Sequence, residues 1–158
     1  MKKHGFHILV VALIGLLMVV SFYMLFVHVP YYQHHHELMN KRNEICESHY
    51  YQYMDYFNEY YGKETYYILK VKINDILTYV VHNEDGDLVK SYQGDIVDEE
   101  FVKKAILDKY QIHIDHLEIA YENNKLVYYG KYQNEKMLMY VYYDLVSGEF
   151  EKAIRLEG

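Results

Sequence analysis

The stretch that decides the fold is residues 64–82, with the sequence ETYYILKVKINDILTYVVH. It contains two runs rich in tyrosine and β-branched residues, residues 64–73 and 76–82, on either side of Asn74-Asp75. Aromatic and β-branched side chains favour strands, and Asn and Asp tolerate the backbone of a tight turn. The stretch therefore predicts an antiparallel hairpin. A turn at residues 83–87 and a short strand at residues 88–92 extend it into a meander.

A second meander follows at an offset of about 61 residues, which places Tyr67 opposite Tyr128 and Tyr79 opposite Tyr140. Its expected strands are residues 117–122, 125–133, 136–144 and 149–156. An amphipathic helix at residues 99–110 precedes it, because Asp98 can cap the first turn and apolar residues then recur at helical spacing. The alternative to a true repeat is chance similarity between tyrosine-rich strands.

The segment before the first meander, residues 37–60, lacks Gly and Pro until Gly62, and we expect it to form a helix. The predicted fold class is thus α+β, with a helix and an antiparallel sheet occurring twice. A unit of about 60 residues buries only a marginal core, so the two units are expected to pack on each other. In pairs such as Tyr66/Tyr67 and Tyr142/Tyr143, one ring is expected to face the helix and the other to face outward.

The first residues form an apolar leader. Residues 6–27 contain only His7, Gly15 and Ser21 as non-apolar members, and as a helix they span about 33 Å, against about 30 Å for a bilayer core. A cleavable signal peptide is the alternative, but the apolar run is long and residues 27–30 (VHVP) lack small residues. We predict a cytoplasmic tail at residues 1–5 and a single transmembrane helix at residues 6–28.

The charges set the expected orientation. Lys2 and Lys3 precede the leader, whereas the other 14 Lys and Arg and all 23 Asp and Glu follow Pro30, which leaves a net charge of −9 there. Lysines favour a cytoplasmic N-terminus, so the body is expected to be extracytoplasmic. An acidic body also argues against nucleic-acid binding.

No motif predicts catalysis, a cofactor or a metal. His34, His35 and His36 are consecutive, and consecutive helical residues point about 100° apart, so they cannot share one ion. His113 and His116 lack the intervening Glu of a zinc-protease motif. Cys46 lies on the expected helix, away from any predicted pocket, and no serine lies in a nucleophile elbow.

Tyrosine is the better functional lead, with 21 residues in 158. Exposed tyrosines are enriched at protein interfaces, although cross-strand pairing within a sheet also explains them. The tyrosines that match between the repeats are interpreted as fold-defining. The unmatched Tyr50, Tyr51, Tyr53 and Tyr92 are therefore the candidate partner-binding residues.

The chain resembles the TseB-like (YpmB-like) membrane proteins of Gram-positive bacteria. The resemblance rests on the N-terminal anchor, GKETYYILK from Gly62, the capped helix DEEFVKKAILDKY from Asp98, and MLMYVYYDLVSGEFEK from Met137. The His34–His36 run and the excess of tyrosine depart from the family pattern.

The resemblance implies two tandem cystatin-like or PepSY-like modules, here residues 29–94, which include a juxtamembrane helix, and residues 95–158. It implies a non-enzymatic regulator of cell-wall elongation that binds a class B penicillin-binding protein. A PepSY-like inhibitor or sensor of a surface protease is the alternative. An enzyme would require a polar pocket that no motif indicates.

Overall fold

The computed structural model describes the backbone of residues 2–158 and the side chains of residue 10 and residues 12–158. The chain divides into two compact units, residues 1–43 and residues 44–158, each of which is described by itself. The side chains of the predicted tail, residues 1–5, lie outside the described ones.

The first unit is helical. Helix α1 (Lys2–Tyr23) is followed by the π-helical segment η1 (Met24–His28) and by α2 (Val29–Ser48). Pro30 has no N–H group, so the regular hydrogen-bond ladder cannot continue through it, and the Val29 N–H instead donates to the more distant Met24 carbonyl. Among the described residues, one helix is long and apolar enough to cross a membrane.

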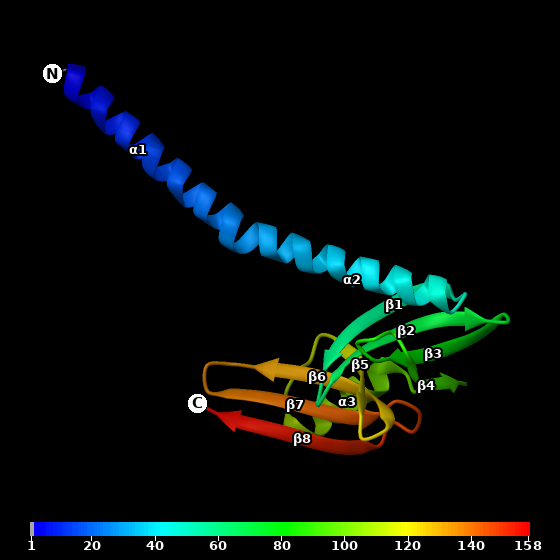
Figure 1. Ribbon diagram of the computed structural model, residues 1–158. Helices are drawn as coiled ribbons and strands as arrows, with labels where there is room; N and C mark the ends of the chain where they lie inside the picture. The colour runs from blue at the N-terminus through cyan, green and yellow to red at the C-terminus, as the bar shows by residue number, and fades with distance from the viewer. Residues whose placement is uncertain (1) are drawn as a thin grey trace. The chain divides into compact units, whose positions relative to one another are not determined.

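The second unit contains two antiparallel sheets of four strands each, shown in Figure 1. Sheet A has the order β1-β2-β3-β4, and sheet B has the order β5-β6-β7-β8. Helix α3 (Glu99–Tyr110) joins the sheets and lies behind β6–β8 in Figure 1. The strands are β1 (Gln52–Tyr61), β2 (Thr65–Ile73), β3 (Ile76–His82), β4 (Leu88–Gln93), β5 (Leu117–Glu122), β6 (Lys125–Gln133), β7 (Met137–Asp144) and β8 (Phe150–Glu157). This arrangement confirms the mixed α+β class and the two predicted meanders.

The predicted helix over residues 37–60 is wrong in its second half. Helix α2 ends at Ser48, and residues 52–61 form strand β1, which pairs with β2. Tyr50 has a φ of 56°, a left-handed conformation that ends the helix. The segment after it is rich in tyrosine and phenylalanine, whose rings pack better on a pleated sheet than on a short exposed helix.

The strand registers agree with the predicted repeat. Lys70 pairs with Tyr79 in the β2–β3 hairpin, and Lys131 pairs with Tyr140 in the β6–β7 hairpin, so both strands shift by 61 residues. The preceding helices obey the same offset, because Tyr50 and Gln111 both follow a helix with φ near +55° (56° and 55°). Two copies of one helix-and-meander pattern therefore explain the register better than chance similarity does.

The two sheets share a core, as their small size leads one to expect. The main cluster combines Ile68 and Val81 of sheet A with Val102 and Ile106 of α3 and Val141 of sheet B. A smaller cluster on the opposite face of sheet A packs Leu69, Val71 and Val80 against Ile45 at the end of α2. Each sheet thus receives one helix on its equivalent face.

The prediction that one tyrosine of each adjacent pair faces outward is wrong for Tyr142 and Tyr143, which are both buried, whereas Tyr66 and Tyr67 are both half-buried. Tyr142 is buried, although it lies on the face of sheet B away from α3, and it contacts the ring of Tyr129. Tyr66 packs against the main cluster. Because sheet A and sheet B pack together, faces that would be outward in an isolated unit become interior.

Candidate functional site

The four candidate tyrosines do not form one patch. Tyr50 is 95% exposed at the end of α2, and Tyr53, near the start of β1, is 36% exposed. Tyr51 is half-buried and stacks on the His49 ring, with the centroids 5.2 Å apart. Tyr92 lies on β4, at the other edge of sheet A, and donates a hydrogen bond to the Asp95 carbonyl. Tyr50, Tyr51 and Tyr53 are thus neighbours along the chain where α2 gives way to β1, and Tyr92 lies apart from them.

Two histidines converge beneath Tyr51. His82 is fully buried, and its Nδ1 lies 2.8 Å from the Gly86 carbonyl oxygen, while His49 Nε2 lies 3.1 Å from the same oxygen. A carbonyl only accepts hydrogen bonds, so both ring nitrogens donate to it. This arrangement fastens the end of α2 to the β3–β4 turn.

The remaining residues weighed for chemistry are dispersed. His34, His35 and His36 lie on α2 within the first unit, and His113 and His116 lie between α3 and β5. His113 is paired with the exposed Asp115. Cys46 is half-buried and packs against the smaller cluster. Among the described residues, no group of three or more His, Cys, Asp or Glu side chains is placed to hold a metal ion.

A polar network links the sheets near Glu122. The Tyr60 hydroxyl donates to Glu122 Oε1 at 2.6 Å, and Lys152 Nζ donates to Oε2 at 2.8 Å. Lys152 also lies over the Tyr142 ring, 4.2 Å from its centroid. Burial raises the pKa of Glu122, but the hydrogen bonds from Lys152 and Tyr60 outweigh it and hold the pKa below its ordinary value. Both carboxylate oxygens are thus occupied.

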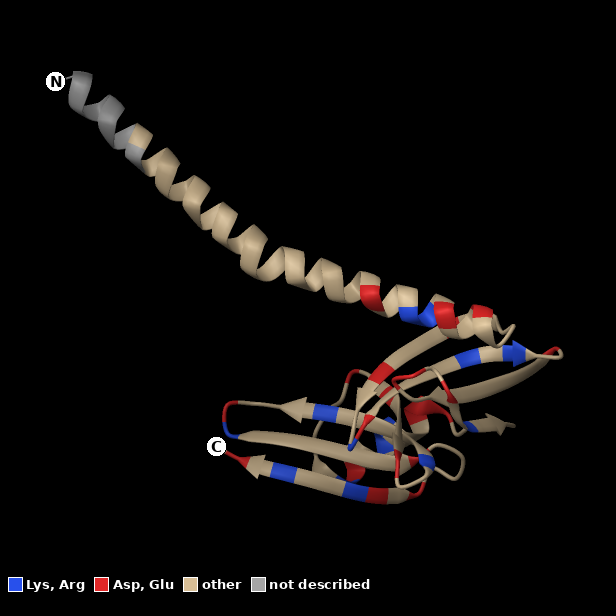
Figure 2. Ribbon diagram, in the orientation of Figure 1, with Lys and Arg blue, Asp and Glu red and all other residues tan. Residues whose placement is uncertain are grey.

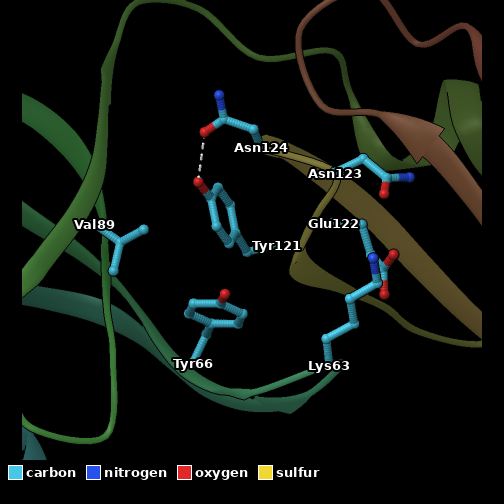
Figure 3. Close-up of a pocket in the computed structure, with 7 residues that line it drawn as sticks. All are labelled: Lys63, Tyr66, Val89, Tyr121, Glu122, Asn123 and Asn124. Carbon is cyan, nitrogen blue, oxygen red and sulfur yellow. Dashed lines mark hydrogen bonds between the residues drawn. The ribbon is translucent and has the colours of Figure 1, made fainter.

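A hollow of about 280 Å³ opens beside this network, and Figure 3 shows its lining. Tyr66 and Tyr121 form its aromatic wall, with ring centroids 4.9 Å apart and the rings nearly perpendicular. The Tyr121 hydroxyl donates to Asn124 Oδ1 at 2.7 Å, as the dashed line in Figure 3 marks. Lys63 and Val89 face the hollow from opposite sides.

A second hollow of about 170 Å³ lies next to the first and shares Asn124 with it. Its lining combines two residues of β4, Lys90 and Tyr92, with Lys125, Leu126 and Asp144 of sheet B and Val146 of the β7–β8 turn. Asp144 caps the β7–β8 turn by accepting hydrogen bonds from the backbone N–H groups of Val146 and Ser147. β4 therefore contributes residues to both hollows.

Sequence reasoning found Tyr92 but missed its neighbours. Lys63 and Asn124 are polar residues in turns, where such residues are common, and nothing in their spacing indicates that the two turns meet. One feature of the sequence does point to this region. The last strand of the first meander, β4, is short and begins with the apolar residues Leu88 and Val89.

The comparisons with known proteins address the fold. Neither the protein-family models nor the curated proteins give a match. Among solved structures, the YpmB protein from Bacillus subtilis is similar, with a TM-score of 0.53 and 24% sequence identity over 65% of this chain and 84% of that chain. At this identity the likeness shows a shared fold.

Proposed function

We propose that this chain is a non-enzymatic, single-pass membrane protein whose body, residues 44–158, binds another membrane protein. The observation that carries the proposal is the combination, in one chain, of a long apolar helix and a body with the fold of YpmB. Large apolar side chains of the helix are exposed, for example Leu16 and Phe26 at 60% and 66%. Such a surface calls for lipid or a partner.

The proposed topology places residues 6–28 in the bilayer, the N-terminus in the cytoplasm and the body outside. Figure 2 shows that, among the residues it describes, charged ones begin only in the later part of the helical segment and are then spread over the sheets. The net charge of −9 on the residues after Pro30 agrees with this orientation, because the only lysines of the leader are at its start.

The proposed role is regulation of cell-wall elongation through a class B penicillin-binding protein. It follows the resemblance to the TseB-like family, with two tandem cystatin-like modules, and the matching registers of the two hairpins support that module reading. Partners anchored in the same membrane meet at a raised effective concentration, so even a modest interface is sufficient.

Binding is favoured over catalysis because the carboxylates at the hollows already have structural partners. Glu122 is held by Tyr60 and Lys152, and Asp144 caps a turn. Glu99, beside a further shallow hollow, accepts hydrogen bonds from Leu117 N–H and Lys103. A general acid or base needs a proton that it can exchange with substrate, and these groups are committed to the fold.

The test is capture of the partner from intact membranes. The tagged full-length chain is crosslinked under mild conditions and purified, and penicillin-binding proteins are detected with a fluorescent penicillin. The proposal expects a class B penicillin-binding protein in the eluate, also when residues 6–28 are replaced by an unrelated spanning helix. No such protein in the eluate, together with inhibition of a surface peptidase by the purified chain, would instead favour the protease-inhibitor role.

A further inference from the structure

We propose that the open edge of β4 binds an extended peptide segment that carries carboxylates. The site, here called the β4 groove, consists of β4 and the two hollows beside it, with Lys63, Val89, Lys90, Tyr92 and Asn124 as its principal residues. The inference deepens the proposed function by naming a binding face, and it rests on that function only for the identity of the protein that supplies the segment.

The backbone of β4 forms an open edge of sheet A. β4 is hydrogen-bonded to β3 on one side, and no described strand pairs with its other side. By contrast, the outer edge of β5 is closed by side chains: Glu99 accepts from the Leu117 N–H, and Tyr56 accepts from the Ile119 N–H. An open edge offers unpaired N–H and C=O groups to an added strand.

β4 differs from the other edge strands in composition or in contacts. β8 carries four charged residues in eight positions, Glu151, Lys152, Arg155 and Glu157, a composition that protects natural sheets against edge pairing. β1 already meets sheet B, because its Tyr56 and Asn58 side chains bond to the backbone of Ile119 in β5. β4 carries one charged residue in six, Lys90, and begins with Leu88 and Val89, which are 48% and 40% exposed.

The two hollows beside β4 provide space for the side chains of an added strand. Alternate side chains of an added strand point toward one face of the sheet, so they require pockets at its edge. The hollows of about 280 and 170 Å³ lie where the edge of sheet A meets the β5–β6 turn, and both have aromatic and aliphatic walls. Asn124, shared by the two hollows, makes them neighbours.

The β4 groove contains both lysines and carboxylates. Among the described residues, neither Lys63 nor Lys90 forms an ion pair through its ammonium group. The two carboxylates that line the hollows, Glu122 and Asp144, are already held by Lys152 and by backbone N–H groups. Lys63 also interacts electrostatically with Glu122 and borders a further hollow lined by Glu64, Glu84 and Asp85. Lys90 is therefore the main uncompensated charge of the β4 groove, and it favours a segment with Asp or Glu side chains or a terminal carboxylate.

The test begins with an unbiased ligand source. The full-length chain in lipid nanodiscs selects peptides from a random phage-displayed dodecapeptide library, and the enriched peptides are synthesised and titrated by fluorescence anisotropy. The proposal expects peptides rich in Asp or Glu together with β-branched residues. Their affinity should fall at least about tenfold when both Lys63→Glu and Lys90→Glu are present.

The control for each single reversal, Lys63→Glu or Lys90→Glu, is Lys136→Glu at an exposed turn of sheet B, which should leave affinity unchanged. N-methylation of every second peptide residue should also be tested, once on the odd and once on the even positions. One of the two peptides should lose binding, because it lacks the N–H groups that pair with β4. Failure to enrich any peptide, enrichment of basic peptides, or equal binding by the double variant would overturn the proposal. So would self-association of the chain that the double variant abolishes, which would assign the groove to a second copy.

The two proposals fail separately. If the double variant binds acidic peptides as tightly as the wild type while the chain captures a penicillin-binding protein from membranes, the β4 groove is contradicted and the proposed function stands. If the wild-type chain binds acidic peptides but captures no such protein, the function is contradicted and the groove stands.

Discussion

Tyr56 of sheet A closes an edge of sheet B at Ile119. Its hydroxyl oxygen accepts a hydrogen bond of 2.6 Å from the Ile119 N–H, and Asn58 donates one of 3.1 Å to the Ile119 carbonyl. Both polar groups of one buried backbone residue are thereby satisfied by side chains from the other sheet. The contact makes the packing of the two sheets specific in register as well as apolar.

Tyr56→Phe should destabilise the body by about 1–3 kcal/mol, because it leaves a buried N–H group without an acceptor. Urea denaturation followed by circular dichroism measures the loss. Tyr61→Phe is the matched control, since its hydroxyl bonds only to Glu59 at the exposed end of the same strand. Equal losses in the two variants would show that the contact at Ile119 contributes nothing specific.

Glu122 should make stability depend on acid pH. Its folded-state pKa lies below the ordinary value of 4.5, because the hydrogen bonds from Lys152 and Tyr60 outweigh burial. The associated stabilisation is therefore complete above pH 4.5 and is lost as the pH falls through the lower, folded-state pKa. Unfolding free energies measured across this range should depend less on pH in Glu122→Gln than in the wild type. An unchanged slope would contradict the assignment.

Tyr128 should oppose unfolding up to strongly alkaline pH. Burial raises its pKa from 10.0 to about 12, and its hydroxyl donates to the Val97 carbonyl at 2.7 Å. Because the folded-state pKa is the higher one, its stabilisation is complete below pH 10.0 and is lost as the pH rises through about 12. Tyrosinate absorbance should show one fewer group ionising near pH 12 in Tyr128→Phe. If the folded variant instead lacks a group that ionises near pH 10 in the folded wild type, the assignment is wrong.

Gly130→Ala should overpack the face of sheet B that receives α3. A Cβ atom there would lie 2.7 Å from Leu117 Cδ2 and 2.9 Å from Ile114 Cδ1, closer than real contacts allow. We expect a loss of about 1–3 kcal/mol in unfolding free energy. The neighbouring Lys131→Ala, at an exposed position, should cost far less. A neutral Gly130→Ala would mean that the loop carrying Ile114 yields freely.

The repeat also explains why this glycine was not identified from the sequence. At the offset of 61, Gly130 corresponds to Leu69, which is fully buried against the end of α2. In sheet B the side chains of Ile114 and Leu117 occupy the position where a side chain at residue 130 would lie. The two copies thus keep the backbone register while exchanging which element supplies the side chain.

Local patterns predicted the hairpins, because alternation, turn residues and the Asp98 cap act over a few residues. The same patterns failed at β1, where strand pairing with β2 and contact with β5 decide the structure. The four candidate partner-binding tyrosines remain a prediction. Tyr50 is exposed as expected, but the β4 groove arises from the meeting of Lys63, Val89 and Asn124, which no local pattern reports.

The most direct test of the account places a photoreactive crosslinker at Val89 in the full-length chain in its native membrane. Val89 is 40% exposed and lines the hollow of about 280 Å³, and Ile76, at the β2–β3 turn, is 51% exposed and serves as the control position. The account predicts a crosslinked band from position 89 that carries a fluorescent-penicillin label and is absent from position 76. A labelled band from position 76 and none from position 89 would contradict it.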